Sequence, residues 1–165
     1  MSENMSFGEG DFVVYPTHGV GKITGVETQE IAGHRLSVFV VHFDKDRMTL
    51  RVPTAKAKTS GLRRLSSRKQ MDAALAKLRG RAKAKRTMWS RRAQEYEAKI
   101  NSGDPISIAE VVRELYRNVG KPEQSYSERQ IYQAALDRLV REFAAVEKID
   151  EPTATKRLEQ ILNAA

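Results

Sequence analysis

The residues best suited to bind a ligand lie around Trp89, the only tryptophan of the chain, in the segment WSRR (89–92). Trp89 falls on the same helix face as Tyr96 and Ile100, and this spacing is typical of a side chain that anchors its helix to a core. Thr87 is the predicted cap of that helix, which would put Trp89 in the first turn, where side chains lean toward the helix N-terminus. The indole would then overhang the helix end. The spacing favours a core anchor but leaves an exposed ring open.

Cations flank this ring on both sides in the sequence. They are Lys85, Arg86, Arg91 and Arg92. Guanidinium and ammonium groups, together with the positive end of a helix dipole, suit phosphates better than a hydrophobic core. An exposed aromatic ring among phosphate-binding cations can wedge into a base step or stack on an unpaired base, which stabilises a complex by about 1–3 kcal/mol per stacked base. The chemistry that these residues could supply is therefore binding of a nucleic acid.

The charge of the 165-residue chain is concentrated in the same region. The net charge is +8, and residues 66–104 contain 11 Lys and Arg against 4 Asp and Glu. Basic side chains that replace the counterions of a phosphate backbone gain free energy from ion release, so this segment favours a polyanionic partner. The alternative is that the run RGRAKAKR (79–86) is only a solvated face or a basic tether, as charge runs commonly are.

The other candidates for chemistry do not form a catalytic or metal-binding pattern. His18, His34 and His42 are scattered without a matching acid or nucleophile, and the chain has no cysteine. Asp44 and Asp46 fall in a tight turn, where carboxylates usually cap backbone N–H groups. We therefore predict a protein that is not an enzyme and has no catalytic site, metal or cofactor.

The elements that must position these residues differ between the two parts of the chain. In residues 1–65, apolar side chains recur at every second position between glycines, which is the period of strands. The expected strands are 11–15, 20–28, 35–43, 47–53 and 62–65, and the third is apolar on both faces and should be central. Five short strands in about sixty residues predict a small, strongly bent barrel of the Tudor or SH3 type.

One face of the fourth expected strand carries Arg47, Thr49 and Arg51. It could be an ordinary polar sheet face. It could also be a docking edge, where a strand of a partner extends the sheet and Arg51 pairs with an acidic group of that partner.

Residues 66–165 predict a bundle of about five helices, so the fold class is α+β with a β-barrel domain (1–65) followed by a helical domain (66–165). The expected N-terminal caps of four helices are Ser67, Thr87, Asp104 and either Ser125 or Ser127, and a fifth, short helix begins near Pro152. The N-terminus lacks the features of an export signal, and no apolar run approaches the length of a membrane span. We expect a cytoplasmic monomer without membrane contact.

Four segments resemble, in this order, the CarD family of bacterial transcription regulators (the CarD/CdnL type). They are GDFVVYPTHGVGKITGVET (10–28), LRVP (50–53), WSRR (89–92) and SGDPISIAEVVRELY (102–116). The first two segments alone would equally suit the polymerase-interacting domain of the transcription-repair coupling factor, whereas WSRR and the helical half point to CarD. The resemblance extends over nearly the whole chain.

The resemblance implies a role for each domain. In that family the Tudor-like domain binds the β subunit of RNA polymerase, and the helical domain contacts promoter DNA at the upstream edge of the transcription bubble. Arg51 then looks like a polymerase contact, within the docking edge that includes Arg47 and Thr49. Trp89 looks like a wedge in the minor groove at the upstream fork, which reverses the preference for a core anchor. By position, Arg91 and Arg92 look like its phosphate partners, and Arg129 matches another basic DNA-facing position. Lys85 and Arg86, which flank the ring in the sequence, complete the predicted DNA-binding set.

A wedge that finds its site mainly after the strands have parted would favour the open complex by about 1–3 kcal/mol, or roughly 5- to 150-fold. We therefore expect an activator that stabilises open complexes at promoters used by the primary sigma factor. Its association with the nucleoid would be through RNA polymerase. Gln29 and Gln94 depart from the family, because some relatives carry basic residues there. Two alternatives remain: a protein–protein adaptor that does not touch DNA, and an RNA-binding module.

Overall fold

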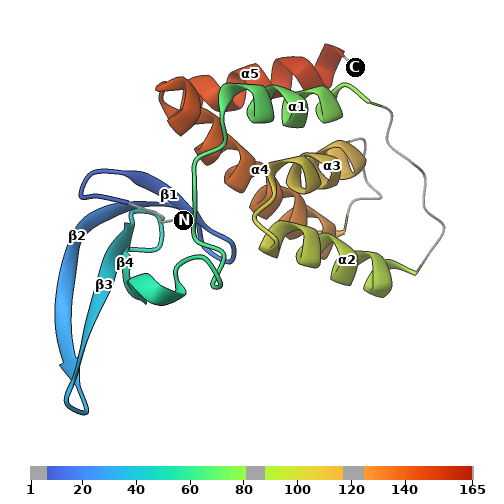
Figure 1. The fold of residues 1–165 in the computed structure, drawn as a ribbon. Helices are drawn as coiled ribbons and strands as arrows, with labels where there is room; N and C mark the ends of the chain where they lie inside the picture. Colours follow the sequence, from blue (N-terminus) through green and yellow to red (C-terminus); the bar gives the residue numbers. More distant parts are fainter. Residues whose placement is uncertain (1–6, 81–87, 117–124, 165) are drawn as a thin grey trace. The chain divides into compact units, whose positions relative to one another are not determined.

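The computed structural model describes residues 7–80, 88–116 and 125–164, apart from the side chain at position 31. The chain forms two compact units, Met1–Leu65 and Ser66–Ala165. Within the described residues, the first unit contains the strands and the second contains the α-helices (Figure 1). This arrangement confirms the predicted α+β class with an N-terminal β unit and a C-terminal helical bundle.

The first unit is a single antiparallel sheet built from β1 Phe12–Tyr15, β2 Gly19–Ile31, β3 His34–Phe43, β4 Met48–Pro53 and β5 Arg63–Arg64. The strand order is β4-β3-β2-β1-β5, and Figure 1 labels β1 to β4. In the part of the chain that the structure describes, β4 and β5 are its two edges. The predicted five-stranded unit is therefore present, although its sheet does not close into a complete barrel. Closure is limited by β5, which is only two residues long and pairs with β1. A 3-10 helix, η1, follows β4 at Thr54–Lys56.

The core of this unit lies on the inner face of the sheet. A Cβ atom added at Gly21 would lie 2.7 Å from Cε1 of Phe43 and 2.8 Å from Cγ1 of Val41, so β2 can cross these side chains only at a glycine. The buried core residues are Phe7, Val13, Ile23, Phe39, Val41, Phe43, Val52, Ala57 and Leu62.

The third strand is central, as predicted, because β3 pairs with both β2 and β4. Its second half is buried on both faces, whereas Leu36 in its first half is 37% exposed. The reason is that β4 ends at Pro53 opposite Val38, so the β2–β3 hairpin extends beyond its neighbour. The hairpin turns at Ala32 and Gly33, which both have positive φ, as the two central residues of a type I′ turn require.

The second unit contains five helices within its described residues. They are α1 Arg68–Leu78, α2 Trp89–Asn101, α3 Pro105–Tyr116, α4 Tyr126–Glu147 and α5 Glu151–Ala164. Three of the predicted caps are confirmed: Ser67 forms a capping box with Gln70, Asp104 accepts from the N–H of Ile106 at 3.2 Å, and Ser125 accepts from the N–H of Glu128 at 3.1 Å. Of the two serines proposed for α4, Ser125 is therefore the cap.

The predicted start of α2 is wrong by one residue. The cap is Met88, whose side chain makes no capping hydrogen bond, rather than Thr87, which lies outside the described residues. The consequence for the ring is small, because Trp89 is still in the first turn, at the first helical position.

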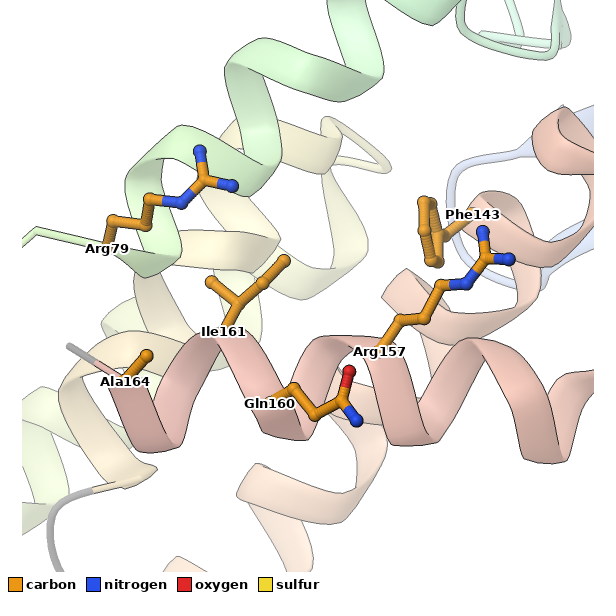
Figure 2. A pocket seen from close by; sticks show the side chains of 6 residues that line it. All are labelled: Arg79, Phe143, Arg157, Gln160, Ile161 and Ala164. Atoms are coloured by element: carbon orange, nitrogen blue, oxygen red, sulfur yellow. The ribbon is translucent and has the colours of Figure 1, made fainter.

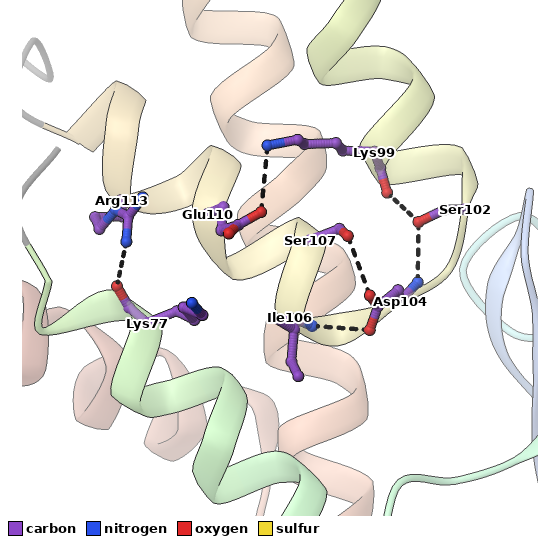
Figure 3. A network of polar contacts seen from close by, with 8 residues as sticks. All are labelled: Lys77, Lys99, Ser102, Asp104, Ile106, Ser107, Glu110 and Arg113. Atoms are coloured by element: carbon purple, nitrogen blue, oxygen red, sulfur yellow. Dashed lines mark hydrogen bonds and ion pairs between the residues drawn. The ribbon is translucent and has the colours of Figure 1, made fainter. Parts of the chain in front are cut away.

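The helices pack around one core, and polar contacts at the surface join them in pairs. Nζ of Lys99 on α2 lies 3.2 Å from Oε1 of Glu110 on α3, and Nη1 of Arg113 on α3 donates to the carbonyl of Lys77 on α1 at 3.4 Å (Figure 3). Among the described residues, no helix is both long and apolar enough to cross a membrane. The buried members of this core include Leu75, Leu78, Tyr96, Ile100, Val111, Leu115, Leu136, Leu139, Phe143 and Leu158.

Candidate nucleic-acid interface

The indole of Trp89 is neither sealed in the core nor fully exposed. It is partly buried and packs against the helical core, and its Nε1–H donates to Oγ of Ser127 at 3.4 Å. Ser127 is in the first turn of α4, so this hydrogen bond joins the N-terminal ends of α2 and α4. The two roles that the sequence left open therefore coexist in one side chain, which anchors α2 and keeps part of its ring at the surface.

Arg92 lies against this ring. Its guanidinium carbon is 5.5 Å from the centroid of the Trp89 ring and 5.7 Å from that of Tyr96, and its Nη2 donates to the Tyr96 hydroxyl at 3.2 Å. The two aromatic rings are themselves tilted by 50° with centroids 6.1 Å apart. A cation over two aromatic faces is attracted by both quadrupoles, so Arg92, Trp89 and Tyr96 form one packed cluster.

Arg91 is placed differently from its neighbour. It is exposed, and among the described residues its side chain has no hydrogen-bond or ion-pair partner. It lines a surface hollow of about 370 Å³ together with Met88, Ser90 and Gln94. An exposed guanidinium of this kind, at the positive end of a helix, is available to a phosphate.

The cations predicted around Trp89 are brought together in part. Arg129 is exposed in the first turn of α4, two residues after Ser127, so it belongs to the same end of the bundle. Lys85 and Arg86 lie outside the described residues.

Two side chains at this end of the bundle were missed by the sequence interpretation. Met88 is 75% exposed and Tyr126 is 74% exposed, next to Trp89 and Ser127 respectively along the chain. The sequence did hold a signal, because Tyr126 directly follows the capping Ser125, as Trp89 directly follows the cap Met88. Both helices thus begin with an aromatic residue, and an exposed aromatic at a positive helix end suits a base next to phosphates.

The predicted docking edge lies in the β unit, on the edge strand β4. Nε of Arg51 is 3.2 Å from Oε1 of Glu27, and the two side chains are 49% and 48% exposed. Glu27 reaches this face because of a β-bulge in β2: Ile23 pairs with Val41, but after the bulge Glu27 pairs with Val38. A one-residue shift moves the following side chains to the opposite face, which places Glu27 on the face of Arg51.

The other docking residues are distributed around this pair. Thr49 faces outward on β4, and its hydroxyl lies 3.2 Å from Nδ1 of His42. Arg47 was predicted to begin the strand, but β4 begins at Met48, and Arg47 lies in the preceding turn with φ 49°. This difference follows from the turn, which reverses the chain through a residue with positive φ. Gln29 is partly buried on β2.

Two groups of the described residues, Tyr132 and Asp150, have clearly shifted pKa values. Burial, and then Glu159 and Tyr116, raise the pKa of Tyr132 well above its usual range, and hydrogen bonds from Thr153 lower the pKa of Asp150. In the described part of the chain, no group of three or more His, Cys, Asp or Glu side chains could hold a metal ion.

The helical unit has a larger hollow that no sequence pattern indicated. It measures about 520 Å³ and lies between the end of α1, α4 and α5. Figure 2 shows Ile161 at its centre, with Arg79 on one side and Phe143 and Arg157 on the other. It shares no residue with the cluster around Trp89.

Comparison with known proteins gives matches over both units. The model of the CarD-like/TRCF RID domain matches residues 7–66, and that of the CarD C-terminal domain matches residues 73–159. The putative transcription factor YdeB of Bacillus subtilis (strain 168) is 27% identical over 142 residues, which cover 86% of this chain and 93% of YdeB. The solved structure of CdnLNt from Myxococcus xanthus is 37% identical over 41% of this chain and 94% of that one, with a TM-score of 0.33.

The two family models confirm the resemblance drawn from the four sequence segments. The C-terminal family model alone spans more than half of the chain, and it includes Trp89, Arg91 and Arg92. The chain belongs to the CarD family, and it is a transcription regulator that interacts with RNA polymerase.

Proposed function

We propose that this protein stabilises the open promoter complex by holding Trp89 against DNA at the upstream edge of the transcription bubble. In this proposal the β unit binds the β subunit of RNA polymerase through the edge of β4. The helical unit then presents the N-terminal ends of α2 and α4 to the parted strands. The protein acts as a monomer and without catalysis.

The observation that carries the proposal is the position of Trp89. Its ring is partly exposed at the first position of a helix, and the exposed cations Arg91 and Arg129 belong to the same end of the bundle. Phosphates suit these cations and the positive helix ends, whereas an unstacked base step suits the ring. A face with both features matches a fork better than it matches an intact duplex.

The magnitude of the effect follows from differential binding. A closed complex has stacked base pairs and no site for the ring, so the stacking energy of about 1–3 kcal/mol is realised mainly in the open complex. That difference corresponds to a shift of roughly 5- to 150-fold toward the open state. Docking of the β unit raises the local concentration of the helices, so weak contacts without sequence preference are sufficient.

The β unit offers two features to polymerase. The outer edge of β4 carries backbone groups that a partner strand could pair with, and Arg51 projects from the same strand. Arg51 is already paired with Glu27, so an acidic group on polymerase must compete with that carboxylate.

The test is a promoter-opening assay with purified polymerase, in which wild type is compared with Trp89→Ala. We expect the variant to bind polymerase normally but to shorten the lifetime of the open complex by 5-fold or more, from the stacking range given above. Asn101→Ala, an exposed change at the other end of the same helix, is the control and should retain the wild-type lifetime. Unchanged opening by Trp89→Ala would refute the wedge.

Two comparisons separate the alternatives. If the protein is an adaptor without DNA contact, its affinity for forked promoter DNA should depend neither on salt concentration nor on Arg91. An RNA-binding module predicts that single-stranded RNA binds more tightly than forked DNA of the same sequence.

A further inference from the structure

The two neighbouring arginines of the WSRR segment have different surroundings. Arg91 is exposed, and its side chain has no partner among the described residues. Arg92 is partly buried: its Nη2 is bonded to the Tyr96 hydroxyl, and its Nε is enclosed without a partner in the described part of the chain. A phosphate can reach the first guanidinium, whereas the second is already committed to the protein.

We infer that Arg92, Tyr96 and Ser127 are positioning residues, which fix the indole of Trp89 in the free protein so that it meets the fork in a preset orientation. The inference rests on the proposed function. It assigns Arg92 a role different from that of the phosphate partner Arg91, and it adds two residues to the site.

Ser127 fixes one edge of the ring. The indole N–H is only a donor, and Oγ of Ser127 accepts it at 3.4 Å from another helix, 38 positions away in the sequence. Rotation of the ring about its side-chain bonds would break this hydrogen bond. The contact therefore restricts the ring to one orientation relative to α4.

Tyr96 and Arg92 fix the ring from within its own helix. Tyr96 is 1% exposed, so core packing holds its hydroxyl in place. That hydroxyl accepts from Arg92 at 3.2 Å, and the held guanidinium lies 5.5 Å from the centroid of the Trp89 ring. The order of action is from the core outward: Tyr96 orders Arg92, and Arg92 orders Trp89.

Preset orientation changes affinity without adding a contact to DNA. A side chain that is free in the unbound protein loses rotamer freedom when it binds, and this loss weakens the complex. A ring that is already ordered avoids that loss. Removing one supporting hydrogen bond should therefore weaken binding to the fork by about 2- to 10-fold, although no atom that touches DNA is removed.

Trp89 is the only tryptophan of the chain, so tryptophan fluorescence reports on this site alone. We would excite the full chain at a wavelength that tyrosine does not absorb, and measure acrylamide quenching for wild type, Tyr96→Phe and Ser127→Ala. Tyr132→Phe is the matched control, since Tyr132 is a buried tyrosine of the same core whose ring contact is with Tyr116. The two variants should be quenched more strongly than wild type, and the control should not.

Forked-DNA affinity then tests whether the orientation matters. Tyr96→Phe and Ser127→Ala should bind the fork 2- to 10-fold more weakly than Tyr132→Phe, with unchanged melting temperature and unchanged affinity for linear duplex. Lysine keeps the charge but cannot reproduce the planar stacked contact, so Arg92→Lys should lose fork binding while Arg91→Lys retains most of it.

Unchanged quenching in both variants would overturn the inference, as would equal tolerance of lysine at positions 91 and 92. Increased quenching with unchanged fork affinity, in an assay where Trp89→Ala loses affinity, would also overturn it. If Trp89→Ala itself retains full fork affinity, the proposed function fails; the quenching measurement alone then decides whether the ring is held in place.

Discussion

The pairing of Arg51 with Glu27 predicts that loss of an acidic residue will strengthen docking on polymerase. The two side chains are about half exposed, and their ion pair spans 3.2 Å across the outer face of the sheet. If Arg51 binds an acidic group of the β subunit, Glu27 competes for the same guanidinium. Replacing Glu27 with Gln removes the competing charge and should raise the affinity.

The size of the gain is bounded by the strength of the pair. Exposed ion pairs stabilise by about 0.2–1 kcal/mol, so freeing Arg51 should tighten binding by about 1.4- to 5-fold. The gain should shrink at high ionic strength, because salt screens exposed charges. Arg51→Ala should weaken binding in the same assay.

The measurement is biolayer interferometry with immobilised core polymerase at two salt concentrations. Glu30→Gln is the matched control, because Glu30 is also exposed on β2 and its loss changes the net charge equally. A general electrostatic effect would make both variants bind alike. The reasoning is refuted if Glu27→Gln binds no more tightly than Glu30→Gln, or if it binds more weakly than wild type.

Three further changes probe stability and DNA binding. Gly21→Ala should lower the free energy of unfolding by about 1–3 kcal/mol, because its Cβ would lie 2.7 Å from a buried ring, and Gly25→Ala, with no atom within 4 Å, should be neutral in the same denaturant titration. Arg91→Ala should lower the slope of log affinity against log salt concentration by the amount that corresponds to about one phosphate contact. An unchanged slope in binding titrations would contradict this. Asp150→Ala should be less stable than wild type at neutral pH. Because hydrogen bonds from Thr153 lower the pKa of Asp150, thermal melts should converge as the pH falls through that lowered value.

The sequence predicted most accurately those features that depend on residues close together in the chain, such as helix caps. A cap and the N–H that it binds are three positions apart or fewer, so Ser67, Asp104 and Ser125 could be identified from the segments around them. The start of α2 has no such signal, since Met88 makes no side-chain cap hydrogen bond. The more favourable capping residue, Thr87, was therefore chosen one position too early.

What the sequence missed depends on register and packing between distant elements. Strict alternation along β2 would put Glu27 on the face of Ile23, toward the core. The bulge between Ile23 and Gly25 reverses that parity and brings Glu27 to Arg51, 24 positions away. A periodic pattern cannot locate a bulge, so the partner of the predicted docking residue could be found only in the structure.

Residue spacing made a core anchor and an exposed ring look like alternatives for Trp89. The reason is that spacing treats every helical residue as if a complete turn preceded it. A residue inside a helix has neighbours on both sides, so a ring on the apolar face is covered. At the first helical position no preceding turn covers the ring, and one edge can pack on the core while another stays at the surface. Tyr126 occupies the same position in α4 but is 74% exposed, which indicates that the position permits exposure and that contacts such as those of Ser127 and Arg92 decide how firmly the ring is held.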